Sequence, residues 1–181
     1  MSAPAGPPLR RSTPRFLLTF ALVAALGFGL LLSTWGQEHV VTPLAEALAG
    51  ITAQVVQGVG GSAHVSGATI RHEGGFAVTV AARCIGLEAL VLLWAGMAAF
   101  PARGRERCIG FAAGAVVMMA FNLVRIISLY GIGPHSATLF EWVHLYSGDL
   151  FAMIPGLIVF VLWIRWLSSQ RRAHPLHAAL A

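Results

Sequence analysis

The sequence contains no lysine and few charged residues of any kind. Only 10% of its 181 residues are charged, whereas 57% are hydrophobic. A soluble domain of this length usually carries about 25% charged residues. The shortage of charge excludes an ordinary soluble domain. It indicates a protein whose solvent is lipid, organised as a single integral membrane domain over residues 1–181.

Several chemical motifs are also missing. The chain has two cysteines, Cys84 and Cys108, and no Cys-x-x-Cys pair, which argues against a quinone-linked thiol oxidoreductase. It has no His-Glu-x-x-His motif of a zinc protease. No histidine lies well inside an apolar stretch, where the ligands of a membrane haem would be expected. The sequence therefore predicts neither a metal nor a cofactor.

The positions of the basic residues argue against nucleic-acid binding. All twelve are arginine, and nine of them fall in three short clusters beside apolar stretches. The clusters are Arg10, Arg11 and Arg15; Arg103, Arg105 and Arg107; and Arg165, Arg171 and Arg172. Such clusters set the orientation of a protein in the membrane. The net charge of +5 thus indicates a lipid bilayer rather than nucleic acid as the partner.

Four apolar stretches are suited to crossing a bilayer, which requires about 20 apolar residues in a helix. The predicted spans are residues 16–35, 85–100, 108–130 and 148–167. The first is longer than the apolar region of a cleavable signal peptide, about 7–15 residues, so we expect it to be retained. The second is short and can be accommodated by local thinning of the bilayer. The predicted fold class is an all-α polytopic membrane protein with four transmembrane helices.

Four spans place the three arginine clusters on one side of the membrane, and the positive-inside rule makes that side cytoplasmic. Both termini are then cytoplasmic. The connecting segments 36–83 and 131–147 face the extracytoplasmic side.

The longer outer segment is expected to contain a small helix followed by a β-hairpin. Thr42-Pro43 is typical of a helix start. Apolar residues then recur at helical spacing and form one stripe: Leu44, Leu48, Ile51, Val55 and Val59. This pattern indicates an amphipathic helix on the membrane surface. Residues 63–71 and 76–81, separated by a glycine-containing turn, are predicted to pair as two strands.

Cys84 follows the predicted hairpin directly and opens the second span. A helix N-terminus favours the thiolate form of a cysteine, and the charge of Arg83 acts in the same direction. Cys108 lies on the opposite side of the membrane, so the two thiols cannot form a disulfide. Cys84 could also be a small apolar residue at a helix start, but a purely structural, unpaired thiol is a liability in an oxidising compartment, which favours a nucleophile. Cys108 is expected to serve packing.

Further polar residues are predicted near Cys84 at the outer face. Arg125 lies inside the third span, about 7.5 Å from its outer end. An ionisable residue there is a functional candidate by default, although it could instead snorkel to the interface. Asn122 shares its helix face. His144 stands just before the fourth span and could act as a base, with His135 as the competing histidine.

Two carboxylates complete the candidate set. Glu88 lies one turn after Cys84 and could bind substrate or pair with Arg125. Asp149 lies close to His144 and could orient its imidazole. Together the residues suit acyl transfer: a thiolate attacks a peptide carbonyl, an imidazole protonates the leaving amine, and a guanidinium stabilises the oxyanion.

Three motifs, in this order, resemble those of the exosortase and archaeosortase family. Residues 65–90 are similar to the segment before and around the family's Cys-x-Gly-Leu/Ile core, and residues 122–126 (NLVRI) resemble its N-x-x-R-I motif. His144 in HLYSGDLF resembles the family's histidine shortly before the last helix. The family's catalytic Cys, Arg and His carry over onto Cys84, Arg125 and His144. With four spans the chain looks like a short form, similar to the exosortase H type.

The resemblance implies an enzyme of the bacterial inner (cytoplasmic) membrane with an extracytoplasmic active site. Its substrates would be secreted proteins that end in a short motif, a transmembrane helix and a basic tail. It would cut near the motif through a thioester at Cys84, followed by hydrolysis or by transfer to a surface acceptor. The competing interpretation is a non-enzymatic assembly or scaffold subunit of a secretion or polysaccharide export system, in which Cys84 is dispensable.

Overall fold

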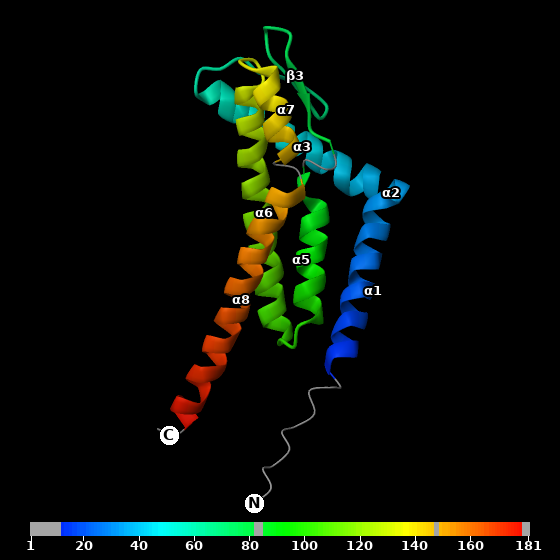
Figure 1. The fold of residues 1–181 in the computed structure, drawn as a ribbon, viewed down its shortest axis with the longest axis vertical. Helices are drawn as coiled ribbons and strands as arrows, with labels where there is room; N and C mark the ends of the chain where they lie inside the picture. The colour runs from blue at the N-terminus through cyan, green and yellow to red at the C-terminus, as the bar shows by residue number, and fades with distance from the viewer. Residues whose placement is uncertain (1–11, 82–84, 147–148, 179–181) are drawn as a thin grey trace, which may run out of the picture.

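Side by side along the long axis of the molecule lie the helices α1 (Ser12–Leu32), α5 (Leu87–Ala99), α6 (Gly104–Ile132) and α8 (Asp149–Ala178) (Figure 1). The structure is a computed structural model that describes residues 12–81, 85–146 and 149–178. Each predicted span falls on one of these helices, and the all-α membrane fold class is confirmed.

Length and composition alone select a slightly different set of membrane-crossing helices. The helices long and apolar enough are Thr13–Leu32, Thr34–Gly58, Gly104–Ile132 and Met153–Arg171. α5 has only 13 residues, or about 20 Å. However, α5 packs against α1, α6 and α8, whereas residues 34–58 run across the ends of these helices (Figure 1). Position in the bundle therefore favours α5 as the span.

Glycines allow the helices of the bundle to approach closely. A Cβ atom on Gly27 of α1 would lie 2.6 Å from Val91 of α5, and one on Gly110 of α6 would lie 2.5 Å from the Trp163 indole of α8. Lipid provides no hydrophobic drive between helices, so close packing at small residues holds such a bundle together. The Trp163 indole also donates a hydrogen bond of 3.0 Å to the Glu106 carbonyl, which joins α8 to α6.

The helix of the first outer segment begins earlier than predicted. Three helical pieces follow one another directly: α2 (Thr34–Gly36), the π-helix η2 (Gln37–Val41) and α3 (Thr42–Gly58). The Ser33 side chain caps the first piece by accepting a hydrogen bond from the Gly36 amide at 3.0 Å. Thr42-Pro43 therefore lies within a helical stretch, where the proline falls at the change from π to α hydrogen bonding and its missing N–H is tolerated.

The buried face of α3 also differs from the predicted apolar stripe. Small residues dominate it: Ala45, Leu48, Ala49, Thr52 and Ala53. Ile51, Val55 and Val59 belong to the predicted stripe but are exposed. The protein thus uses small side chains for close packing and leaves larger apolar ones on the outer side of this helix.

The predicted hairpin is present within a three-stranded antiparallel sheet. The strands, in spatial order, are β1 (His64–Ser66), β2 (Thr69–Arg71) and β3 (Ala77–Thr79). The predicted single strand 63–71 folds back on itself because Gly67 adopts a φ of 58°, which permits a two-residue turn. The turn between β2 and β3 lies where it was predicted.

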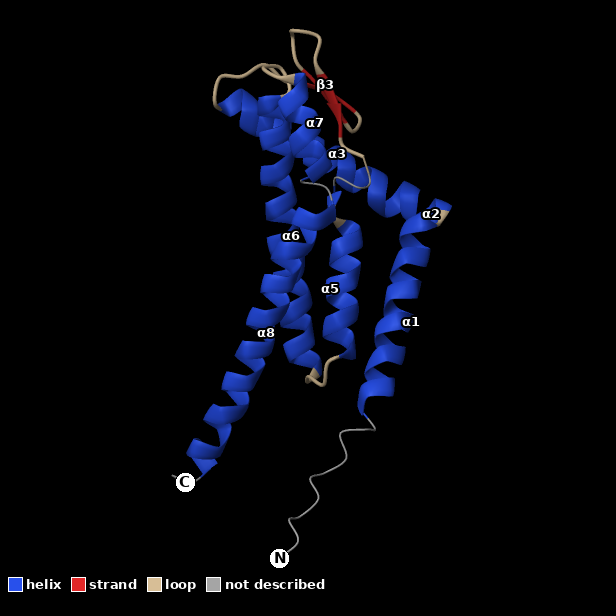
Figure 2. Ribbon diagram, in the orientation of Figure 1, coloured by secondary structure: helices blue, strands red, loops and turns tan. Residues whose placement is uncertain are grey.

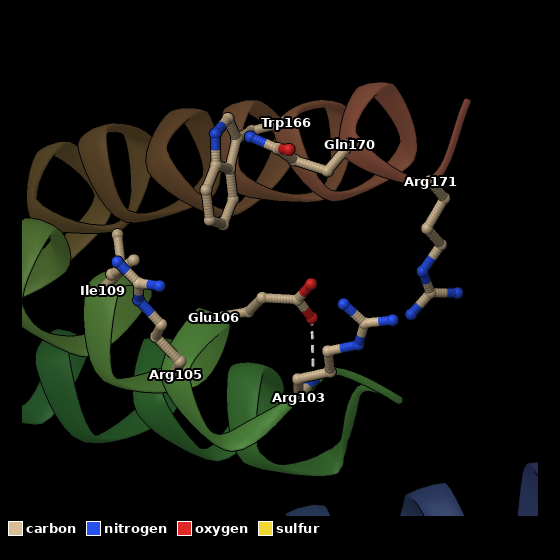
Figure 3. Close-up of a pocket in the computed structure, with 7 residues that line it drawn as sticks. All are labelled: Arg103, Arg105, Glu106, Ile109, Trp166, Gln170 and Arg171. Carbon is tan, nitrogen blue, oxygen red and sulfur yellow. Dashed lines mark hydrogen bonds between the residues drawn. The ribbon is translucent and has the colours of Figure 1, made fainter. Parts of the chain in front are cut away.

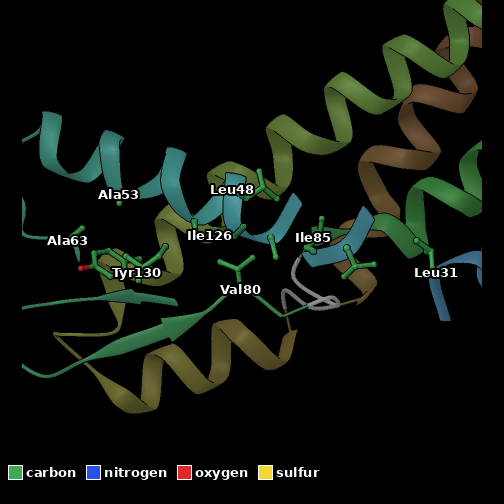
Figure 4. Packing of buried hydrophobic residues seen from close by; sticks show 12 residues of the cluster. Leu31, Leu48, Ala53, Ala63, Val80, Ile85, Ile126 and Tyr130 are labelled. Carbon is green, nitrogen blue, oxygen red and sulfur yellow. The ribbon is translucent and has the colours of Figure 1, made fainter. Parts of the chain in front are cut away.

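Residues 34–81, from α2 to the end of the sheet, form a cap on one end of the bundle (Figure 2). Ile70 and Val80 of the sheet region belong to one buried cluster with Ile126 and Tyr130 of α6 (Figure 4). The Tyr130 hydroxyl also donates a hydrogen bond of 2.7 Å to the Ser62 carbonyl. α6 therefore anchors the cap, and we call this end of the molecule the cap end.

An additional helix lies in the segment 131–147, which was expected to be a loop. It is α7 (Ala137–Tyr146), and its first turn is capped by a hydrogen bond of 3.2 Å from the Leu139 amide to the Ser136 hydroxyl. Phe140 of α7 meets Phe76 at the base of the β2–β3 turn, edge to face, with ring centroids 5.6 Å apart. α7 therefore packs against the cap.

Candidate functional site

The two ends of the bundle differ in their chemistry. The start of α1, the connection between α5 and α6 and the last turns of α8 lie together at what we call the arginine end (Figure 1). A cavity of about 630 Å³ opens there between α6 and α8 (Figure 3). Its lining residues are Arg103, Arg105, Glu106, Ile109, Trp166, Gln170 and Arg171. These side chains include no thiol, hydroxyl or imidazole, so this cavity does not suit catalysis by a thiol or a hydroxyl nucleophile with a histidine base.

Arg125 lies toward the other end of α6, seven residues before its last residue, Ile132, or about 10 Å along the helix axis. It is 8% exposed. A snorkelling arginine extends its guanidinium to water, whereas Arg125 is buried among helices. An intramembrane arginine held in this way is a candidate for binding charge in a substrate or transition state.

Asn122 and Gly86 bring the first two sequence motifs into direct contact. Gly86, which precedes α5, has a φ of 74°, in the left-handed region. A Cβ atom on it would lie 2.1 Å from the Asn122 amide nitrogen, so only glycine fits. That nitrogen donates a hydrogen bond of 2.9 Å to the Met118 carbonyl. Asn122 is fully buried, and its Oδ1 has no hydrogen-bond partner within the described part of the chain.

The remaining predicted site residues are placed only in part. Cys84 lies outside the described residues. His144 belongs to α7 and Asp149 begins α8, but their side chains are outside the described part. Glu88 lies in the first turn of α5 and is exposed, and His135 is exposed in the turn after α6. The roles of these residues, and the choice between the two histidines, stay predictions.

No group of three metal-ligating side chains occurs within residues 12–81, 85–146 and 149–178. Cys108 is a free, exposed thiol on the first turns of α6, at the arginine end. It had been assigned to packing, and its exposure contradicts that assignment.

Another cavity, which the sequence had not suggested, lies at the cap end next to β3. Its volume is about 210 Å³. The lining residues are Ala77, Val78, Thr79, Val80, Ile126, Leu129 and Phe140. Ile126 directly follows Arg125, and Leu129 lies one turn beyond it on the same helix face. This cavity therefore adjoins the motif residues of α6.

Residues 10–177 match the family model of transmembrane exosortases (Exosortase_EpsH). No curated protein and no solved structure matches significantly. The family match covers nearly the whole chain, including all three motifs, and confirms the predicted resemblance, whereas the short-form subtype stays a prediction. The chain therefore belongs to the transmembrane exosortase family.

Proposed function

We propose that this multi-pass membrane protein is a cysteine protease or transpeptidase that cleaves C-terminal sorting signals of secreted proteins through a thioester. The observation that carries the proposal is the contact of Gly86 with Asn122, one turn before the buried Arg125. It joins the residues of two family motifs in one place at the cap end.

Covalent geometry extends this contact toward the nucleophile. Cys84 precedes Gly86 by two residues, so their Cα atoms lie within about 7 Å of each other. Arg125 follows Asn122 by three residues, about 4.5 Å along the axis of α6. In the proposed site, a thiolate at Cys84 and the guanidinium of Arg125 act on the same substrate carbonyl, and these short spacings support that pairing.

These positions support an acyl-transfer mechanism. The Cys84 thiolate attacks the carbonyl carbon of the scissile peptide bond, and the carbonyl oxygen becomes an oxyanion that accepts hydrogen bonds from Arg125. When the intermediate collapses, the C–N bond breaks and the leaving amine takes a proton from His144. The product is a thioester between Cys84 and the substrate. Water or an acceptor nucleophile then attacks it, loses a proton to the histidine and regenerates the thiolate.

The distribution of charge supports an orientation for this chemistry. The described arginines of the three clusters, among them Arg15, Arg103 and Arg171, fall at the arginine end, which the positive-inside rule assigns to the cytoplasm. The cap end then faces the extracytoplasmic side, where exported substrates arrive. The sheet indicates that the cap lies outside the lipid hydrocarbon, where an open strand edge is not tolerated, and the arginine clusters alone assign its side.

The test is processing of a secreted reporter in the native host. The reporter carries a C-terminal sorting signal from the same genome: a motif, a transmembrane helix and a basic tail. We expect Cys84→Ala to abolish the shift in reporter mass while the protein remains in the membrane. Cys108→Ala, the matched control at the arginine end, should process normally. Wild-type processing by Cys84→Ala would overturn the proposal and favour the scaffold subunit instead.

A further inference from the structure

β3 is an edge strand, and its outer edge carries unpaired backbone groups. Val80 donates its amide hydrogen to the Ala68 carbonyl at 2.8 Å, and the Phe76 carbonyl accepts a hydrogen bond from the His72 amide at 2.7 Å. In an antiparallel ladder, alternate residues point their backbone groups to the same neighbour. Phe76, Val78 and Val80 therefore bond to β2.

The residues between them point the other way. Ala77 and Thr79 direct their N–H and C=O groups away from β2, and no strand lies on that side within the described residues. Both residues are exposed. The Thr79 hydroxyl is engaged with Thr69 across the ladder at 3.0 Å, so it does not cover the edge. Such an edge is a template for one more strand.

The edge is adjacent to the cap-end cavity. Every residue from Ala77 to Val80 lines the cavity of about 210 Å³, which is completed by Ile126 and Leu129 of α6 and Phe140 of α7. Apart from Thr79, these side chains are apolar, so the cavity suits one or two small apolar side chains. Phe140 closes it toward the β2–β3 turn by its contact with Phe76.

From this juxtaposition we propose that the free edge of β3 binds the substrate as an added β-strand, with an apolar substrate side chain in the adjoining cavity. This inference rests on the proposed function and specifies how that site holds its peptide. Backbone hydrogen bonds from Ala77 and Thr79 supply affinity for an extended peptide, and the cavity selects one side chain. Because Ile126 follows Arg125 directly, a peptide on this edge lies beside the residues assigned to the chemistry.

The preferred test removes one backbone donor. Thr79→Pro deletes the outward N–H and fills its position with the pyrrolidine ring. The hydrogen bonds of Val78 and Val80 to β2 remain. Edge strands tolerate proline when the missing N–H faces away from the ladder, as it does here. Thr79→Val keeps the N–H and loses the same side-chain contact with Thr69. We expect Thr79→Pro to raise the apparent KM for reporter processing by up to about tenfold, the effect of losing one such hydrogen bond. Thr79→Val should stay near wild type.

A second measurement leaves β3 unchanged and varies the peptide instead. A synthetic peptide covering the motif region of the reporter's sorting signal is bound to the Cys84→Ala protein in detergent. Its amides are replaced one at a time by esters, which removes single N–H donors from the peptide. Losses of affinity at alternate positions support strand addition, whereas equal affinity for all ester variants would overturn it. Normal processing by Thr79→Pro would also overturn strand addition. The loss of reporter processing in Cys84→Ala tests the proposed function separately.

Discussion

Gly86 is the residue at which two motifs of the site constrain each other. Gly86→Ala would place a Cβ atom 2.1 Å from the Asn122 amide nitrogen and would hold an alanine at a φ of 74°. The left-handed conformation alone costs about 1–2 kcal/mol for a residue with a Cβ atom. We therefore expect a clear fall in the Tm of the detergent-solubilised protein and loss of reporter processing.

The control for this prediction is Gly50→Ala in α3, where nothing lies within 4 Å of the added atom. Because alanine is a better helix former than glycine, the Tm of Gly50→Ala should equal that of the wild type or lie slightly above it. The double variant Gly86→Ala with Asn122→Ala removes the overlap but keeps the backbone strain, so it should recover only part of the loss. Equal Tm values for Gly86→Ala and Gly50→Ala would show that the contact does not constrain the site.

Arg125 gives a second prediction at the residue scale. Arg125→Lys keeps the positive charge but loses the planar fork that donates two parallel hydrogen bonds. If Arg125 binds the oxyanion, processing should fall by about 10²–10³-fold, the usual loss for one oxyanion donor. The amount of protein in the membrane should not change. Arg105→Lys, an exposed position at the arginine end, is the matched control. Near-normal turnover in Arg125→Lys would assign this residue a structural role.

A site residue could be predicted when its own residue type stood out in the sequence, but not when its role depends on a contact between two elements. Arg125 was predictable, since a charge within an apolar helix stands out in sequence. The contact between Gly86 and Asn122 was not, because it depends on the relative height of two helices. The turn at Gly67 was not predicted either, because residues 63–71 read as one continuous strand; the turn places β2 in the middle of the sheet, whereas residues 76–81 form an edge strand in both arrangements.

At the scale of elements, the hydrogen bond from Tyr130 to Ser62 is a polar contact that joins the cap to α6. Tyr130→Phe keeps the ring in the buried cluster but removes the hydroxyl that lies 2.7 Å from the Ser62 carbonyl. A hydrogen bond of this kind contributes about 0.5–1.5 kcal/mol. We expect limited proteolysis in the segment between α3 and β1 to accelerate up to about tenfold. An unchanged cleavage rate would show that apolar packing alone fixes the cap.

Elements were predicted best where the apolar signal was long. The four bundle helices agree with the predicted spans to within a few residues at most ends, although α8 continues well past the predicted boundary at residue 167. The start of α3 and the existence of α7 were missed. In the first case a π-helical turn precedes Pro43, and in the second a Ser136 cap was available as a signal.

For the whole molecule, the decisive question is whether the short helix α5 or the transverse helical stretch of residues 34–58 crosses the membrane. If α5 spans, the cap and the arginine end lie on opposite sides. If residues 34–58 spanned in its place, the β2–β3 turn and the connection between α5 and α6 would share one side. The side-by-side packing of α5 with α1, α6 and α8 (Figure 1) favours the first arrangement.

Single cysteines in a Cys84→Ser, Cys108→Ser background distinguish these arrangements. Glu73→Cys lies at the β2–β3 turn, where the native side chain is 72% exposed, and Gly104→Cys lies at the start of α6 with open space around it. In intact spheroplasts, a membrane-impermeant maleimide should label Glu73→Cys, and it should label Gly104→Cys only after the membrane is opened. Labelling of both, or of neither, before opening would place the cap and the arginine end on the same side. The proposed extracytoplasmic site would then lose its physical basis, because Arg125 and the edge of β3 could not meet an exported substrate.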